Sequence, residues 1–202
     1  MTSHRIIKNL KRSGNTVLGV GCYSAVLSSK SGEEAIKVGT NLDDPWLDFY
    51  SLAIQEDPTN PHFPEIKNFY QDENHEFYIC TLEQLHEISP THEDLITLVK
   101  KYTEGFLSDD EFLQEARKYS KHVPYPQQLM NAVKIIKTYT THYKFEEGFD
   151  VTYDSVECDR CLDMHRGNFM FRDELLVITD PWCNYEMSDV EDLSGWAEDN
   201  LL

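Results

Sequence analysis

The chain has 202 residues, of which 36 are Asp or Glu, 18 are Lys or Arg and 40% are hydrophobic, so its formal net charge is −18. This composition predicts a folded acidic protein and excludes the disordered, collagen-like and disulfide-scaffold classes. Because a surface this negative repels a phosphate backbone, we expect no direct nucleic-acid binding, whereas divalent cations and basic proteins are suitable partners.

The expected compartment follows from apolar runs and cysteines. No stretch approaches the roughly 18 apolar residues that cross a bilayer, and no apolar segment of a secretion signal follows the charged start. Five scattered cysteines suit a reducing compartment, so we expect a cytoplasmic protein without a membrane partner. Cys158 and Cys161 have metal-ligand spacing, but no second pair accompanies them, which favours two partly buried thiols.

Up to about residue 83, the sequence predicts a small sheet with one helix. Apolar and β-branched runs separated by Gly, Ser, Asn and Pro indicate the strands. The predicted strands are 16–20, 23–27, 34–38 and 77–81. Asp44 is a suitable cap for a helix that begins at Pro45, and apolar residues follow at helical spacing.

From about residue 92 to 145 the apolar spacing becomes helical, with a proline break at 124–126. The apolar runs 168–171 and 175–178 then predict a hairpin, because turn-forming residues divide them. The last 18 residues hold six acids and no base, and we expect a docked helix or a frayed tail there. The predicted class is α+β, and the predicted domains are 1–83, with the small sheet, and 84–202, mainly helical.

A glycine-containing turn follows the first predicted strand, in the sequence Gly19-Val-Gly21-Cys-Tyr-Ser24. Glycines let the backbone bend tightly and approach a phosphate closely, and this spacing fits a strand-turn-strand over nucleotide phosphates. The alternative interpretation is that these glycines only form an ordinary hairpin turn. A P-loop is excluded because no Gly-Lys-Ser/Thr follows, and a Rossmann turn is disfavoured because a strand follows instead of a helix.

Lys37 lies inside an apolar predicted strand, so its charge needs a cleft or an anion. Strand alternation puts Ala35 and Lys37 on one face, where Ala35 leaves room for an adenine ring. A phosphate is a natural partner for the ammonium group. The alternative is an edge lysine that faces solvent.

The densest group of polar residues consists of Asp163, His165, Asn168 and Asp180. The predicted hairpin brings the two ends of this segment together, so Asn168 and Asp180 can supply hard oxygen ligands to Mg²⁺. Asp163 then stays available for an acceptor hydroxyl. The alternative is that these residues are turn formers and helix caps that cluster by chance.

The order and spacing of these residues resemble the eukaryotic-like protein kinase superfamily. The resemblance rests on Asp163-x-x-x-x-Asn168, on Thr179-Asp180 after the hairpin and on Lys37 within Ala-Ile-Lys-Val. With Gly-x-Gly-x-Tyr-Ser-Ala, the set is similar to the early serine/threonine protein kinases of T-seven-type bacteriophages. The similarity covers roughly residues 14 to 183.

The resemblance implies a minimal bilobal kinase-like fold, with ATP and Mg²⁺ as cofactors and host bacterial proteins as substrates. It implies that Asp163 orients the substrate hydroxyl, that Lys37 holds the α- and β-phosphates, and that Asn168 and Asp180 bind Mg²⁺. His165 stands where protein kinases have a catalytic-loop lysine, and aminoglycoside-phosphotransferase-like kinases share such a histidine. The implied nucleotide-binding residues are Gly19, Gly21, Ser24, Val26, Ala35, Lys37, Met170 and, through its backbone, Glu83.

Departures from the kinase pattern keep other functions open. The helix glutamate that pairs with the strand lysine is not evident, since Asp44 is better explained as a cap, and Asp48 and Glu56 are the alternatives. Pro181 follows the metal-binding aspartate, and only 22 residues follow Asp180, too few for a peptide-binding platform. The alternatives are a small-molecule phosphotransferase, or a catalytically weak kinase-fold protein whose negative charge binds and inhibits a host enzyme.

Overall fold

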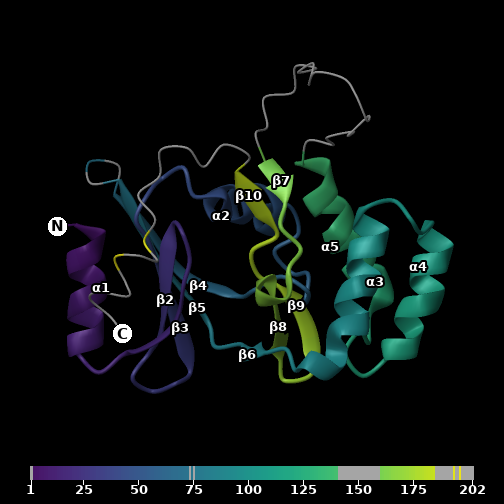
Figure 1. The fold of residues 1–202 in the computed structure, drawn as a ribbon, viewed down its shortest axis with the longest axis horizontal. Coiled ribbons are helices and arrows are strands. Elements are labelled where there is room, and N and C mark those ends of the chain that lie inside the picture. Colours follow the sequence, from purple (N-terminus) through teal and green to yellow (C-terminus); the bar gives the residue numbers. More distant parts are fainter. Residues whose placement is uncertain are drawn as a thin grey trace, which may run out of the picture.

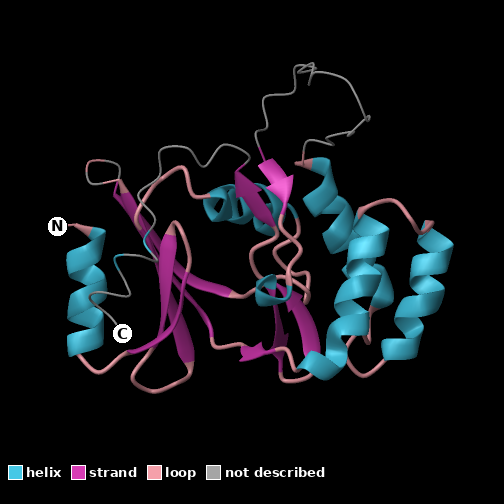
Figure 2. Cartoon of the chain, in the orientation of Figure 1, coloured by secondary structure: helices cyan, strands magenta, loops and turns pink. Residues whose placement is uncertain are grey.

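The computed structural model describes residues 2–72, 74, 76–140, 160–184, 193 and 196. It confirms the predicted α+β class, with a five-stranded antiparallel sheet on one side and a group of helices on the other (Figure 1, Figure 2). Two smaller sheets lie between these parts. Within the described residues, no helix is long and apolar enough to cross a membrane.

The large sheet has the strand order β1-β2-β3-β5-β4, and every neighbouring pair is antiparallel. Its strands are β1 (Thr16–Val20), β2 (Ser24–Ser28), β3 (Glu34–Gly39), β4 (Ile66–Asp72) and β5 (Phe77–Glu83). The four predicted strands are confirmed. The edge strand β4 was not predicted, because its side chains are exposed or half-buried and lack the period-two alternation of a strand with one buried face.

One face of this sheet is covered by α1 (Ser3–Arg12), for which the sequence analysis predicted no element. Ile7 of α1 is fully buried with Leu27 of β2 and with Leu193 from the acidic C-terminal segment. Trp196 packs edge-on against a histidine of α1. These two described residues of the predicted tail therefore dock on α1, and the rest of the tail lies outside the described residues.

The other face of the sheet packs against α2 (Pro45–Asp48), which continues as the π-helix η1 (Phe49–Ile54). The predicted helix start is confirmed, because a proline occupies the first helical position and Asp44 accepts a hydrogen bond from the Trp46 N–H at 2.9 Å. Trp46 stacks on Tyr78 of β5 with ring centroids 5.5 Å apart. This stacking holds the helix start against the sheet.

The predicted helical region contains three α-helices that contact one another. They are α3 (Glu93–Thr103), α4 (Asp109–Ala116) and α5 (Pro126–Thr138). Ser108 and Glu111 form a capping box at the start of α4, and the predicted proline break precedes α5. Short 3-10 helices are η2 (Pro90–His92), η3 (Arg117–Tyr119) and η4 (Arg166–Asn168). Residues 141–145 of the predicted region lie outside the described residues.

The predicted hairpin is confirmed, and its strands pair with a third strand. This sheet consists of β6 (His86–Glu87), β8 (Phe169–Arg172) and β9 (Leu175–Ile178). A separate antiparallel pair, β7 (Arg160–Leu162) and β10 (Trp182–Asn184), joins the segments before and after the hairpin. The pair closes a loop in which both ends of the polar segment lie together.

One group of buried side chains runs from the inner face of the large sheet into the helices. It includes Trp46, Phe49, Tyr78, Leu95, Leu129 and Phe169. This core crosses the boundary predicted between residues 83 and 84, and the division into two domains stays a prediction. Because this core is packed without interruption, it fixes the side chains of the large sheet relative to the loops that follow residue 83.

Replacing Gly39 by Ala should strongly destabilise the protein. A Cβ at this position in β3 would overlap the ring of Tyr78, which is fully buried. We expect a loss of at least about 3 kcal/mol in the free energy of unfolding, measured by urea denaturation. Gly19→Ala is the matched control, because no heavy atom lies within 4 Å of its added Cβ. Equal stability of the two variants would contradict this account of the packing.

Candidate functional site

The four residues at the centre of the predicted site come from separate elements. Lys37 lies within β3, Asp163 follows β7, Asn168 ends η4 and Asp180 follows β9. Lys37 Nζ donates a hydrogen bond to Asp180 Oδ2 at 3.0 Å, across 143 positions of the sequence. The fold therefore brings the strand lysine and the second aspartate into direct contact.

Hydrogen bonds join the loops that carry the three oxygen-bearing residues. The Asp163 N–H donates to the Pro181 carbonyl at 2.7 Å, and the Thr179 N–H donates to the Asn168 carbonyl at 2.9 Å. Asn168 Nδ2 donates to the Asp163 carbonyl at 2.7 Å. Both residues flanking Asp180 are thus bonded to the segment from Asp163 to Asn168, which makes one connected unit.

Lys37 is almost buried, with 4% of its surface exposed. Its ammonium nitrogen lies 4.8 Å from the centroid of the Trp46 ring, a distance at which the ring face attracts a cation. β3 lies in the middle of the sheet, between β2 and β5. These observations exclude the alternative of an edge lysine that faces solvent.

Asp180, the partner of Lys37, is influenced by two further carboxylates. Asp44 is 4% exposed, and its Oδ2 accepts a hydrogen bond from the Tyr78 hydroxyl at 2.5 Å. Burial is the largest cause that raises the pKa of Asp180; Lys37 lowers it, and the carboxylates of Asp44 and Asp163 raise it further. The resulting excess of negative charge makes the site suitable for a divalent cation.

The acid that pairs with the strand lysine is Asp180, whereas Asp44 and Glu56 have other partners. Asp44 is a helix cap, as predicted, and it also holds the hydroxyl of Tyr78. Glu56 accepts a hydrogen bond from the Tyr139 hydroxyl at 2.8 Å, which directs it toward α5. The pairing of a sheet lysine with a helix acid, expected from the kinase pattern, is replaced here by a contact across the site.

Asn168 and Asp180 have the chemistry of the predicted Mg²⁺ site. Asn168 uses Nδ2 for its bond to Asp163, which leaves the amide oxygen as its ligand atom. No cluster of three or more His, Cys, Asp or Glu side chains that could hold a metal occurs in the described part of the chain. A Mg²⁺ ion at this place would therefore take further oxygens from substrate phosphates and water.

His165 borders Asp163 and shapes the loop. Its Nδ1 accepts a hydrogen bond from the Gly167 N–H at 3.0 Å, and its Nε2 lies 3.5 Å from Asp163 Oδ2. A Cβ at Gly167 would lie 2.8 Å from the His165 ring, so a side chain there would displace the imidazole from this position. The imidazole is 59% exposed. It can order the loop and contact a substrate at the same time.

The turn between β1 and β2 contains the predicted phosphate-covering residues. Gly19 is exposed and pairs with Val26 across these strands. The Gly21 N–H donates to the Ser24 carbonyl at 2.9 Å, which closes the turn. Ser24 is 9% exposed and lies opposite Gly39 of β3. The turn has the hydrogen bonding of a hairpin, and its role in covering phosphates stays a prediction.

The other predicted nucleotide contacts lie on β2, β3 and β8. Val26 and Lys37 are direct partners across the β2–β3 pair, so their side chains emerge on the same face as Ala35. Ala35 is 6% exposed. Met170 is half-buried on β8, where its neighbours Phe169 and Phe171 face the core instead.

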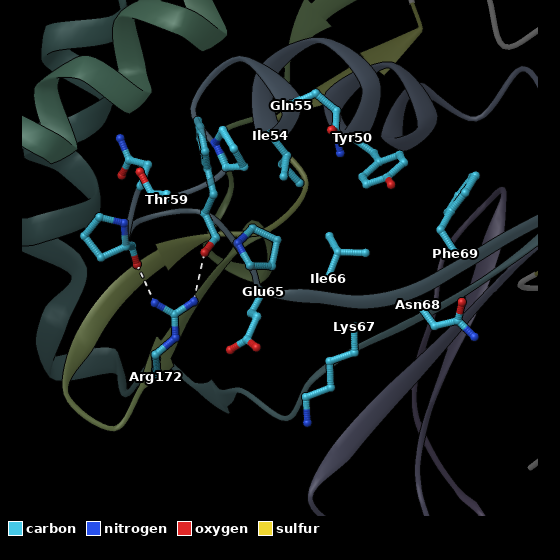
Figure 3. Close-up of a pocket in the computed structure, with 15 residues that line it drawn as sticks. Tyr50, Ile54, Gln55, Thr59, Glu65, Ile66, Lys67, Asn68, Phe69 and Arg172 are labelled. Carbon is cyan, nitrogen blue, oxygen red and sulfur yellow. Dashed lines mark hydrogen bonds between the residues drawn. The ribbon is translucent and has the colours of Figure 1, made fainter.

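Glu83 has a structural role that the sequence analysis missed. Its carboxylate accepts two hydrogen bonds from the Arg172 guanidinium and one from the Glu65 N–H at 2.7 Å. Its own N–H donates to the Glu65 carbonyl at 3.1 Å, so this group is already used. Arg172 also donates to the carbonyls of Pro61 and Phe63 (Figure 3). Nothing in the sequence indicated this pairing, because Arg172 lies in a predicted turn and Glu83 is 89 positions earlier.

Figure 3 shows the pocket beside Arg172, which is separate from the predicted site. Its volume is about 780 Å³, and its lining comes from η1, the 58–64 loop and the first residues of β4. None of the predicted site residues lines it. The pocket therefore lends no support to the predicted nucleotide contacts. Cys158 lies outside the described residues, so the metal-binding alternative for Cys158 and Cys161 stays a prediction.

Comparison with known proteins adds no assignment. No protein-family model and no curated protein matches the chain. A proposal of function therefore rests on the sequence motifs and on the geometry around Lys37 and Asp180.

Replacing Asp180 by Asn should change the pH dependence of stability. The pKa of Asp180 is raised to about 6 in the folded protein, whereas the pKa of an Asp in an unfolded chain is about 3.9. The ionised carboxylate therefore lowers the stability of the folded protein as the pH rises from about 4 through 6. The free energy of unfolding of Asp180→Asn minus that of wild type should therefore rise by about 1–2 kcal/mol from pH 4.5 to pH 7.5. This value is reduced because the Asp180 side chain is 34% exposed.

Urea unfolding of both proteins at the two pH values measures this difference. Gly19→Ala serves as the control, because it changes no charge and should differ from wild type by the same amount at both pH values. A relative stability of Asp180→Asn that is constant or falls with pH would contradict the proposed electrostatics.

Proposed function

We propose that the protein is an ATP- and Mg²⁺-dependent phosphotransferase with a bilobal kinase-like fold. In this fold the large sheet and its inner helix form the first lobe, and α3 to α5 belong to the second. The Lys37–Asp180 contact at 3.0 Å carries the proposal, because it joins the two motif residues that must face the same triphosphate. The strand order, with Lys37 on a central strand and a helix on the inner face, supports the same fold.

In this proposal Lys37 binds the α- and β-phosphates of ATP. Its burial makes the ammonium group a strong electrostatic partner, because little water competes for it. Asp180 and the amide oxygen of Asn168 would hold the Mg²⁺ ion, and the Asp180 carboxylate would then give up its bond to Lys37. When bound at these residues, Mg²⁺ would supply positive charge against the phosphate oxygens.

Asp163 acts on the acceptor. Its side chain is 37% exposed, so a hydroxyl group can reach the carboxylate. Asp163 orients this hydroxyl and accepts its proton while the γ-phosphoryl group moves from the β-phosphate oxygen to the acceptor oxygen. The hydrogen bonds of the Asp163 N–H to Pro181 and of the Asp163 carbonyl to Asn168 hold its backbone beside Asn168 and Asp180, so the carboxylate starts from a fixed position.

The nucleotide is proposed to lie between the two lobes. Val26 and Ala35 from the first lobe and Met170 from the second would enclose the adenine ring. The turn from Gly19 to Ser24 would cover the phosphates, with backbone donors other than the Gly21 N–H, which is bonded to the Ser24 carbonyl. The N–H of Glu83 is bonded to Glu65, so the backbone donor to adenine would come from another residue of the connection after β5.

The proposed acceptors are Ser and Thr hydroxyls of proteins, and the resemblance to phage kinases makes host bacterial proteins the first substrates to test. A small-molecule hydroxyl is the second candidate. It is favoured by His165, which is 59% exposed beside Asp163 and stands where aminoglycoside-phosphotransferase-like kinases have a histidine. Both candidates use the same phosphate and metal contacts.

Transfer of phosphate from labelled ATP tests this function directly. With bacterial extract and a panel of sugars, aminoglycosides and nucleosides as acceptors, wild type should label at least one acceptor when Mg²⁺ is present. Lys37→Met, Asp163→Asn and Asp180→Asn should each reduce the rate at least about 100-fold, because each removes about 3 kcal/mol of transition-state stabilisation.

Lys67→Met is the matched control for the loss of a lysine. Lys67 lies on β4, is half exposed and pairs with Glu34 outside the site, so transfer should be unchanged. Absence of transfer by wild type to every acceptor, or full activity of the Asp163 variant, would contradict the proposal. Host-enzyme inhibition that survives Lys37→Met and weakens with salt would favour the alternative of an acidic binding protein.

Nucleotide binding should stabilise the protein only when Mg²⁺ is present. At ATP concentrations about 100-fold above Kd, mass action predicts about 2.7 kcal/mol of stabilisation, which is a rise of roughly 5–10 °C in Tm. ATP without Mg²⁺ should give little shift, because the carboxylates around Lys37 repel the triphosphate. Differential scanning fluorimetry measures the effect, and an equal shift with and without Mg²⁺ would contradict the proposed site.

A further inference from the structure

Two cysteines face each other next to the candidate site. Cys161 of β7 and Cys183 of β10 are direct partners in the antiparallel pairing, and their Sγ atoms are 2.7 Å apart. Both are free thiols and both are half-buried, so a small oxidant can reach them. A disulfide requires Sγ atoms about 2.05 Å apart on residues whose side chains point toward each other. The Cys161–Cys183 pair needs only a small further approach.

We propose that Cys161 and Cys183 form a reversible disulfide that joins β7 to β10. The oxidant is a hydroperoxide. The two thiols give up two electrons and two protons, the S–S bond forms, and one hydrogen peroxide molecule is reduced to two water molecules. A low-molecular-weight dithiol reverses the reaction by thiol–disulfide exchange. In a reducing compartment the bond forms only during oxidative stress.

The cross-link would tie together the two ends of the candidate site. Cys161 precedes Asp163 by two residues, and Cys183 follows Asp180 by three. The hydrogen bond from the Asp163 N–H to the Pro181 carbonyl, 2.7 Å long, lies between the strand pair and the site. A covalent bond would prevent β7 and β10 from separating and so hold this geometry. The proposal does not depend on the phosphotransferase function.

The sequence allows an unambiguous test by mass spectrometry of the full chain. The reduced protein is treated with hydrogen peroxide, its remaining thiols are alkylated, and it is digested with trypsin without a reductant. Cleavage at Arg160, Arg166 and Arg172 puts Cys161 and Cys183 in separate peptides, and Cys158 in a third.

We expect a linked species of peptides 161–166 and 173–202 that dithiothreitol separates. Alkylation of both cysteines after oxidation, or a bond from Cys161 to Cys158, would overturn the proposal. This readout uses the wild-type chain, so it remains decisive even where a cysteine variant does not fold.

Stability provides the second measurement. Cys161 and Cys183 are 22 positions apart, and closing a loop of this length should raise Tm by about 5–10 °C on oxidation. The rise should disappear in Cys161→Ser and in Cys183→Ser. It should persist in Cys22→Ser, the matched control in the turn between β1 and β2. A linked wild-type protein without a higher Tm would overturn the inference that the bond holds β7 and β10 together.

Discussion

A buried ammonium group constrains the whole molecule. Lys37 lies in a central strand where water is scarce, and an unpaired buried charge costs several kcal/mol. Its charge is matched by Asp180, from a segment near the other end of the chain, and by the face of Trp46. The inner face of the large sheet must therefore meet the loop after β9, and the continuous core holds both in that position.

This arrangement concentrates negative charge in a protein that is already acidic. The carboxylates of Asp44 and Asp163 raise the pKa of Asp180, the partner of Lys37, and Asp44 is held in place as both a helix cap and the acceptor for a buried tyrosine hydroxyl. Such a cluster is unfavourable for folding by itself. It becomes favourable when a divalent cation and a polyphosphate bind together, because the cation offsets the negative charge of both the carboxylates and the phosphates. The same reasoning supports the proposed phosphoryl transfer.

Local patterns predicted much of the fold. Strands β1, β2, β3 and β5, the β8–β9 hairpin and the Asp44 cap depend on periodicity, turn residues and capping within a few positions, so the sequence shows them directly. The elements that were not predicted have weak sequence patterns. α1 presents an apolar stripe between many charged residues, β4 is an exposed edge strand, and β7 and β10 have three residues each. Their existence depends on what they pack against.

The sequence by itself determined which groups are available for chemistry and the short spacing that joins Asp163 to Asn168. Only the tertiary structure decided that Lys37 binds Asp180 and that the carboxylate of Glu83 binds Arg172. These partners are 143 and 89 positions apart. Contacts at such separations result from the packing of one core shared by sheet and helices, and no local propensity encodes them.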